Sequence, residues 1–257
     1  MNSFPAFDLT GQIALVTGAA RGLGRAISLA LAHAGADVAL GLRDIHADAG
    51  LPAEIQALGR RVLPLQMDVA HLDQIRRAVD DTVAHFGRLD ILVNNAGVTH
   101  LPMPMEEVGE DDFERVLAVN VKSVYLTARA LVPHFKARRA GTILNIASTA
   151  AVSPRPRLSW YNASKGWMVT ATKSMAIELA PFGVRVNAIN PVAGETPLLK
   201  TFMGEDTPEI RAKFLSTIPL GRFSTPEDMG NAACFLCSDE ASMITGVAME
   251  VDGGRVI

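Results

Sequence analysis

Tyr161 and Lys165 have the side-chain types and the spacing of a proton-transfer pair. They stand four positions apart in a stretch of helical periodicity, so both side chains project from one face of a helix. A phenol has a reference pKa of about 10 and is a poor base near neutral pH until a neighbouring ammonium stabilises its anion. The pair could therefore exchange a proton with a substrate, although an ordinary polar contact on a helix surface would have the same spacing.

Ser148 and Asn120 are two further polar side chains in places that could serve such chemistry. Ser148 directly follows an apolar run that ends at Ala147, so its hydroxyl lies at the end of an expected strand and could hold a substrate oxygen in line with Tyr161. Asn120 is an amide in the middle of an apolar helical stretch, which is uncommon unless the amide has a partner. Taken singly, each residue also fits an ordinary structural role.

Three glycines lie between an apolar run and a helical stretch near the N-terminus. Glycines let the backbone approach a pyrophosphate closely, and a helix N-terminus offers free N–H groups to the phosphates. The spacing is G-x-x-x-G-x-G, which an ordinary glycine-rich turn could also show. We interpret this loop as a dinucleotide-binding site formed by Gly18, Arg21, Gly22, Leu23 and Gly24.

The end of the second apolar run bears on which dinucleotide binds. An acidic residue there would bond the ribose 2′-hydroxyl of NAD(H), but this position is Leu42, followed by Arg43. The guanidinium groups of Arg43 and Arg21 suit a 2′-phosphate, so NADP(H) is favoured. NAD(H) stays possible, because a shift of one residue in the strand would bring Asp44 near the ribose.

Polar and small residues at two further strand ends extend this site. Asp68, next to Val69, could accept a hydrogen bond from the adenine amino group. Asn95, Ala96 and Gly97 end the fourth apolar run, where small residues would let the ribose and diphosphate lie close. Each of these segments alone is also typical of a turn.

Short apolar runs alternate with helical stretches along the whole chain, which predicts a parallel sheet covered by helices on both faces. We expect a Rossmann-type, doubly wound α/β fold in a single domain spanning residues 1–257. The excursion at 191–219, rich in glycine and proline, follows a strand and is interpreted as a substrate lid. The expected strands are 13–17, 37–42, 61–66, 91–94, 141–146, 185–189 and 246–250, and the expected helices are 22–34, 46–58, 72–86, 111–138, 160–182 and 226–238.

Composition excludes several other classes of protein. The 257 residues are 49% apolar and 20% charged with a net charge of −3 and no basic stripe, which argues against a nucleic-acid partner. We find neither a signal-peptide pattern nor an apolar run near the roughly 20 residues of a membrane helix, so we expect a cytoplasmic protein without a membrane partner. Cys234 and Cys237 form a C-x-x-C without a second pair or clustered histidines, so we predict core packing and no metal site.

These motifs, in this order and spacing, resemble the short-chain dehydrogenase/reductase (SDR) family over nearly the whole chain. The resemblance implies hydride transfer between NADP(H) and a carbonyl or alcohol substrate in a homotetramer. It implies that Tyr161 is the acid/base, that Ser148 orients and polarises the substrate oxygen, and that Asn120 holds a water in the proton path. Lys165 would lower the pKa of Tyr161 and bind the nicotinamide ribose.

One loop departs from the pattern of the family, and several questions stay open. Many members have Pro-Gly-x-Ile/Val-x-Thr after the sixth strand, where this chain keeps Pro191 and Thr196 for the cofactor but has Val192, Ala193, Gly194 and Glu195 between them. The substrate could be a 3-oxoacyl thioester, a sugar or a hydrophobic ketone or alcohol. A non-catalytic dinucleotide sensor or scaffold is the alternative function. The expected pocket residues are Leu101, Met103, Met105, Trp160, Leu198, Phe202 and Met203, with Arg155 and Arg157.

Overall fold

A seven-stranded parallel sheet forms the centre of the molecule, as the alternating pattern predicts. The computed structural model describes residues 7–47 and 50–257. The strand order is β3-β2-β1-β4-β5-β6-β7. From β1 the chain adds β2 and β3 on one side of the sheet, then returns to add β4 to β7 on the other side, so the strand order reverses between β1 and β4. The strands are β1 (Ile13–Thr17), β2 (Asp37–Leu42), β3 (Val62–Gln66), β4 (Ile91–Asn94), β5 (Gly141–Ile146), β6 (Val184–Pro191) and β7 (Ala248–Val251).

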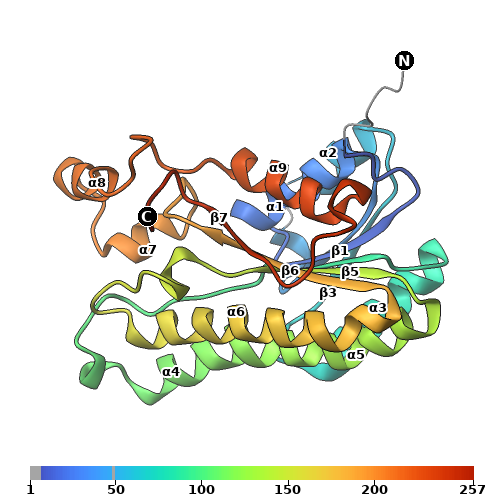
Figure 1. Ribbon diagram of the computed structural model, residues 1–257, viewed down its shortest axis with the longest axis horizontal. Coiled ribbons are helices and arrows are strands. Elements are labelled where there is room, and N and C mark those ends of the chain that lie inside the picture. Colours follow the sequence, from blue (N-terminus) through green and yellow to red (C-terminus); the bar gives the residue numbers. More distant parts are fainter. Residues whose placement is uncertain (1–6, 48–49) are drawn as a thin grey trace.

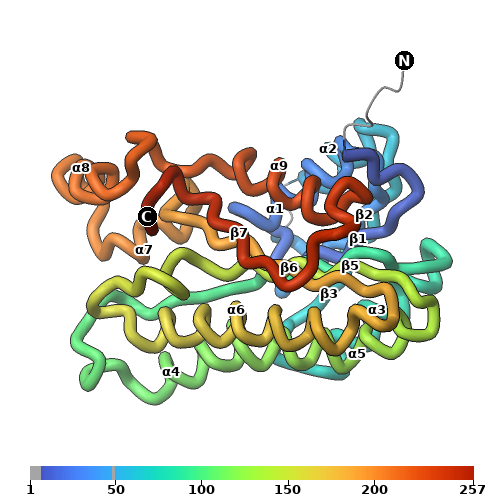
Figure 2. Tube along the Cα trace, in the orientation of Figure 1, coloured from blue at the N-terminus to red at the C-terminus, as the bar shows by residue number. Residues whose placement is uncertain are grey.

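Helices cover both faces of this sheet (Figure 1). One face carries α1 (Gly22–His33), α2 (Leu51–Ala57) and α9 (Pro226–Cys237). The other face carries α3 (Leu72–Phe86), α4 (Glu110–Leu117), α5 (Ser123–Arg138) and α6 (Ser159–Leu179). Two short helices, α7 (Leu199–Met203) and α8 (Pro208–Leu215), lie outside these layers, on the side of the molecule where α6 begins (Figure 2).

The central strands are largely apolar because both of their faces are covered by helices. In β1, Ile13 and Leu15 pack into the core under α3, α5 and α6, whereas Ala14 and Val16 pack into the core under α1, α2 and α9. Successive side chains of a strand point to opposite faces, so a sheet between two helical layers needs apolar residues at every position. The fold class expected from the sequence is therefore confirmed.

Two expected helices are divided in the structure. The expected helix 111–138 is interrupted by a π-helical turn, Ala118–Lys122, which separates α4 from α5. The expected helix 46–58 is a 3-10 turn, Ile45–Ala47, followed by α2, which starts at Leu51 after Gly50 in a left-handed conformation. Residues 48–49 of that prediction lie outside the described residues. Both differences come from local backbone geometry that apolar spacing does not encode.

The two cysteines belong to the core. Cys234 and Cys237 are buried in α9, and burial raises the pKa of their thiols to about 11 and about 12. A thiol with so high a pKa is unreactive near neutral pH. Across residues 7–47 and 50–257, no cluster of three or more histidine, cysteine or acidic side chains could hold a metal ion. No helix in this part of the chain is both long and apolar enough to cross a membrane.

Candidate active site

A cavity of about 960 Å³ lies at the carboxyl ends of the central strands. It extends past the point between β1 and β4 where the strand order reverses, which is where open α/β sheets bind ligands. Every residue that the sequence assigned to the cofactor lines this cavity, and so do Ser148, Tyr161 and Lys165. Of the four residues assigned to catalysis, Asn120 does not line the cavity.

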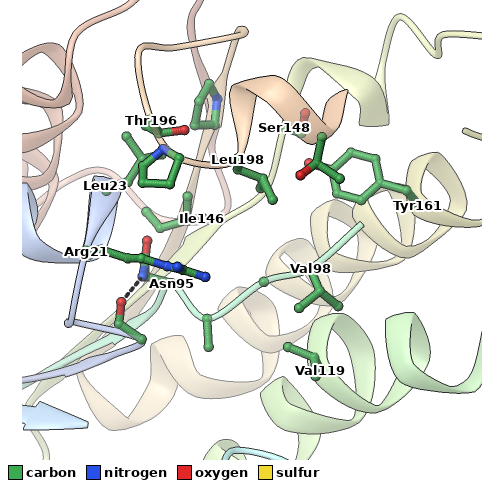
Figure 3. A pocket seen from close by; sticks show the side chains of 18 of the residues that line it. Arg21, Leu23, Asn95, Val98, Val119, Ile146, Ser148, Tyr161, Thr196 and Leu198 are labelled. Carbon is green, nitrogen blue, oxygen red and sulfur yellow. Dashed lines mark hydrogen bonds between the residues drawn. The ribbon is translucent and has the colours of Figure 1, made fainter. Parts of the chain in front are cut away.

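Hydrogen bonds from Asn95 and close packing between its glycines hold the glycine loop in one conformation. Asn95 Nδ2 donates to the carbonyl oxygens of Thr17 at 2.8 Å and Gly18 at 3.1 Å (Figure 3). A Cβ on Gly24 would overlap both Asn95 Nδ2 and the Gly18 carbonyl oxygen, and Gly18 has a φ of +65°. Only glycine satisfies both positions.

The same loop delivers the N-terminus of α1 to the cavity. No side chain caps this helix and its first turn holds no acidic residue, so its first N–H groups are available to an anion. These groups, with the close backbone approach at Gly18 and Gly24, fit the pyrophosphate of a dinucleotide.

The end of β2 has the strand register that the sequence predicts. Leu42 is fully buried, and Arg43 follows it on the surface at the edge of the cavity. Asp44 also lines the cavity, but its carboxylate accepts the His46 N–H at 3.0 Å and caps the following turn. Within the described residues, neither Arg43 nor Arg21 forms an ion pair with a carboxylate, so both guanidinium groups can receive a phosphate.

Asp68 and the residues after Asn94 line the cavity, whereas Asn94 itself belongs to the core. Asp68 Oδ1 accepts the Ala70 N–H at 2.9 Å, and the residue lines the cavity beside Val69. Asn94, by contrast, is buried and donates to Asn145 Oδ1 at 2.9 Å, so only the residues after it reach the cavity.

At the opposite end of the cavity, Ser148 lies beside the phenol of Tyr161 (Figure 3). Burial raises the pKa of Tyr161 to about 12, although hydrogen bonding by Ser148 and the charge of Arg155 act in the lowering direction. Lys165, which the resemblance implies should lower that pKa, lies near the same ring. Its ammonium lies 5.9 Å from the centre of the Tyr161 ring and donates to the Ile146 carbonyl oxygen at 2.7 Å.

Burial also changes the acidity of Lys165, whose pKa falls to about 8. The side chain sits inside the molecule with a single protein acceptor, the Ile146 carbonyl oxygen, among the described residues. An ammonium has three N–H donors, so two remain for a ligand in the cavity.

Asn120 stands behind the cavity wall, in the π-helical turn. Its Oδ1 accepts the Val98 N–H at 2.9 Å, and its Nδ2 donates to the Val98 carbonyl oxygen at 2.9 Å and to Ser164 Oγ at 3.0 Å. A Cβ added at Gly97 would contact both Asn120 Oδ1, at 3.6 Å, and Lys165 Nζ, at 3.5 Å, so both groups lie beside Gly97. The amide therefore holds the segment after β4 in place and, like the Lys165 ammonium, lies beside Gly97.

The loop after β6 reaches the cavity despite its departure from the family pattern. Pro191 and Thr196 line the cavity, and Thr196 N–H donates to the Gly194 carbonyl oxygen at 2.8 Å in a tight turn. Gly194 itself pairs with Ser224, whose carbonyl oxygen accepts the Glu195 N–H at 3.0 Å. The turn therefore directs the backbone of Gly194 away from the cavity.

Only part of the expected substrate pocket is formed. Leu198, Phe202 and Arg155 line the cavity, and the Phe202 ring packs edge-on against Tyr161 at 5.0 Å between centroids. The others lie elsewhere: Leu101 and Met105 are exposed, Trp160 packs on Phe113, Met203 joins the small core of α7 and α8, and Met103 and Arg157 are outside the lining.

The sequence analysis missed other residues that line this end of the cavity. Ala118 and Val119 reach it because the π-helical turn displaces them, a change that apolar spacing does not show. Leu158 and Ala150 flank Tyr161 in a small apolar cluster. The available signal was their place in the sequence, because Leu158 directly precedes the helix of Tyr161 and Ala150 lies in the turn after Ser148.

A parallel sheet of this order, with a glycine loop at its reversal point, defines a dinucleotide-binding protein of the Rossmann type. A family profile described as enoyl-(acyl carrier protein) reductase matches residues 18–255. The chain is 48% identical over 251 residues to 4-formylbenzenesulfonate dehydrogenase from Comamonas testosteroni, covering 97% of this chain and 100% of that protein.

Two solved structures agree with these matches. A 3-ketoacyl-(acyl-carrier-protein) reductase from Brucella melitensis complexed with NADH has a TM-score of 0.90 and 48% identity, covering 97% of this chain and 100% of that one. A gluconate 5-dehydrogenase from Burkholderia cenocepacia in complex with NADP and tartrate has a TM-score of 0.91 and 32% identity, covering 98% and 97%. The chain therefore belongs to the short-chain dehydrogenase/reductase family, whose members are nicotinamide-dependent oxidoreductases.

Proposed function

We propose that this oxidoreductase interconverts a carbonyl compound and the corresponding alcohol with Ser148, Tyr161 and Lys165 at the reacting end. The observation that carries the proposal is the placement of the Ser148 hydroxyl beside the Tyr161 phenol, in the cavity that the glycine loop enters from its other end. Hydride transfer to or from the substrate carbon is the chemistry that a bound nicotinamide supplies at such a site.

The side chains of the protein would manage the substrate oxygen and its proton. A phenol with a pKa of about 12 is protonated at neutral pH, so Tyr161 can donate a proton to the oxygen of a carbonyl as negative charge builds there. Ser148 donates a second hydrogen bond to the same oxygen. Lys165 and Asn120 both lie beside Gly97, and a water bound by these two groups would return a proton to the site.

Substitution of Tyr161 by phenylalanine tests this assignment. We expect Tyr161→Phe to lower kcat for NADPH-dependent carbonyl reduction by about 10²- to 10⁴-fold, because the general acid is lost. Its dissociation constant for NADPH, measured by fluorescence, should change by less than about threefold, because the glycine loop, which would hold the pyrophosphate, is unaltered. Tyr125→Phe is the matched control, since Tyr125 is exposed on α5. Full activity in Tyr161→Phe would refute the assignment, and cofactor binding without turnover of any carbonyl would indicate a sensor.

We further propose NADP(H) as the preferred cofactor, with Arg21 and Arg43 on the 2′-phosphate. Support comes from the buried Leu42 at the end of β2 and from the two guanidinium groups that line the cavity beside it. NAD(H) is the alternative, and the solved relatives include complexes with either NADH or NADP.

Two proposals concern larger parts of the molecule. The segment 191–219, with α7 and α8, would act as a lid over the substrate, which the packing of Phe202 on Tyr161 supports.

The chain would assemble as a homotetramer through α5, α6 and β7. Large apolar side chains exposed on α5 and α6 support that assembly, namely Tyr125, Trp167 and Ile177.

A further inference from the structure

Arg155 has no role in the proposed reaction, yet its side chain lies at the reacting end. It stands in the loop between Ser148 and Tyr161 and lines the same cavity as both. Asn162 Nδ2 donates to the Arg155 carbonyl oxygen at 2.7 Å and fixes this loop on α6. The charge of Arg155 lowers the pKa of Tyr161, so the guanidinium is close enough to the phenol to act on it.

The guanidinium of Arg155 lacks a counter-ion within the described residues. Its carbon lies 3.9 Å from the centre of the Phe214 ring, in α8, and no carboxylate pairs with it in residues 7–47 and 50–257. The other arginine near this end of the cavity, Arg115, is paired with Asp112 at 2.6 Å. A half-buried cation without a partner is unfavourable, and burial accordingly lowers the pKa of Arg155 to about 10.

A second cation adds to the positive potential around Arg155. The charge of Arg255, near the C-terminus, acts on Arg155, and Arg255 donates to Ser153 Oγ at 3.3 Å. Its Nε is buried and has no hydrogen-bond partner within the described residues. Arg155 therefore lines the cavity as a cation without a carboxylate partner among the described residues, in a positive potential that favours an anion from outside the chain.

We propose that Arg155 binds an oxyanion, a carboxylate or a sulfonate, carried by the carbonyl substrate. The inference rests on the proposed function and narrows its substrate class to acidic carbonyl compounds and acidic alcohols. Apolar side chains, including Leu158 and Phe202, line the cavity around Tyr161. The body of the substrate between its carbonyl and its anionic group is therefore apolar.

Matched aldehydes of one shape test this assignment. The ratio of kcat/KM for 4-formylbenzoate to that for neutral 4-formylbenzamide is measured in the wild-type protein, in Arg155→Met and in Arg157→Met. We expect the wild type to favour the anion by about 10-fold or more and Arg155→Met to lose that preference through KM, because charge-assisted pairing is lost. Arg157→Met is the control, since Arg157 is exposed outside the cavity, and should keep the wild-type ratio.

The ratio of kcat/KM for the two aldehydes separates binding of the anion by Arg155 from an effect of Arg155 on the pKa of Tyr161. Loss of the Arg155 charge also raises the pKa of Tyr161, which changes kcat for both aldehydes alike and leaves the ratio unaffected. A wild-type ratio near one, or an unchanged ratio in Arg155→Met, would overturn the inference. Arg155→Lys keeps the charge without the two-pronged geometry, and partial recovery of the ratio would support direct contact with the anion.

Direct binding separates this inference from the proposed reaction. If neither aldehyde is reduced, the proposed function fails, and calorimetric titration of the NADPH-loaded protein with benzenesulfonate and with neutral benzenesulfonamide still tests the anion site. Preferential binding of benzenesulfonate to the wild type and not to Arg155→Met would uphold the site. Equal binding of both compounds by the wild type would refute it.

Discussion

At Tyr161 and Lys165, burial opposes the charged form of both side chains. The pKa of the phenol rises to about 12 and that of the ammonium falls to about 8. The types and spacing of these residues could be read from the sequence. Their acidities could not, because burial and the neighbouring Arg155 depend on how distant segments pack.

Burial of Lys165 should make the free energy of unfolding depend on pH. Its pKa is about 8 in the folded protein against an ordinary 10.5, so between these values the unfolded state binds more protons and folding becomes more favourable as pH rises. Lys165→Met lacks this contribution. The free energy of unfolding of Lys165→Met relative to wild type should therefore fall by up to about 3 kcal/mol between pH 7.5 and pH 10.5.

Urea denaturation of both proteins at several pH values measures that difference. Ionisation of the two buried thiols affects both proteins equally and cancels in the comparison. A difference that does not vary with pH would show that Lys165 is not desolvated in the folded protein.

Arg43 should set the preference between the two nicotinamide cofactors. We expect Arg43→Ala to reduce the ratio of kcat/KM for NADPH to that for NADH by about 10- to 100-fold, because an exposed charge-assisted contact with the 2′-phosphate is lost. Steady-state kinetics with either cofactor measures the ratio. Arg60→Ala is a suitable control, because Arg60 does not line the cavity. A wild-type protein that favours NADH would contradict the proposal.

The π-helical turn is the element that most affects the site and that the sequence analysis did not predict. Apolar spacing on either side of it is continuous, so residues 111–138 were expected to form one helix. The turn places the Asn120 amide against the backbone of Val98. Asn120 was nevertheless identified as unusual, because an amide among apolar residues needs a partner.

Removal of the Asn120 amide should destabilise the protein. Asn120→Ala leaves the part-buried N–H and carbonyl groups of Val98 without their side-chain partner, at a cost of about 1–3 kcal/mol in the free energy of unfolding. Thermal and urea denaturation measure this loss. Asn231→Ala, at an exposed position of α9, should change stability by less than about 0.5 kcal/mol. Equal stability of the two variants would show that the contacts with Val98 are not important.

The glycine loop provides a second test at the level of an element. A Cβ on Gly24 overlaps the Gly18 carbonyl and Asn95, so Gly24→Ala must shift the loop and should weaken NADPH binding by about 10-fold or more. Gly109→Ala is the control, because a Cβ there meets nothing within 4 Å and the residue has a φ of −63°. Fluorescence titration compares the two, and equal affinities would mean that the loop tolerates a side chain.

For the molecule as a whole, the number and nature of the strands could be predicted, but their order could not. Buried strands such as β1 and β5 are short local runs of apolar residues, so their bounds followed from composition alone. The pairing of β1 with β4 depends on contacts between distant segments, which local apolar runs do not encode. The same limit explains why the cofactor end was predicted more fully than the substrate end, whose residues come from irregular loops.

The exposed faces of α5 and α6 should mediate assembly. We expect light scattering at micromolar concentration to give the mass of a tetramer, and Ile177→Glu to shift it toward smaller species, because Ile177 is 79% exposed on α6 and a buried glutamate would be unpaired. Met243→Glu, at a residue 97% exposed outside these helices, should leave the mass unchanged. A single monomeric peak for the wild type would rule out the tetramer.

Phe202 covers the edge of the Tyr161 ring and comes from α7, a short helix outside the main layers of the fold. Displacement of that helix would admit water to the phenol and return its acidity toward that of tyrosine in solution. The strength of the proton donor thus depends on a segment remote from it in sequence. The Tyr161 phenol would then have a higher pKa while α7 covers the bound product than after α7 has moved away. If product release were slow, the pH profile of kcat would reflect the higher pKa.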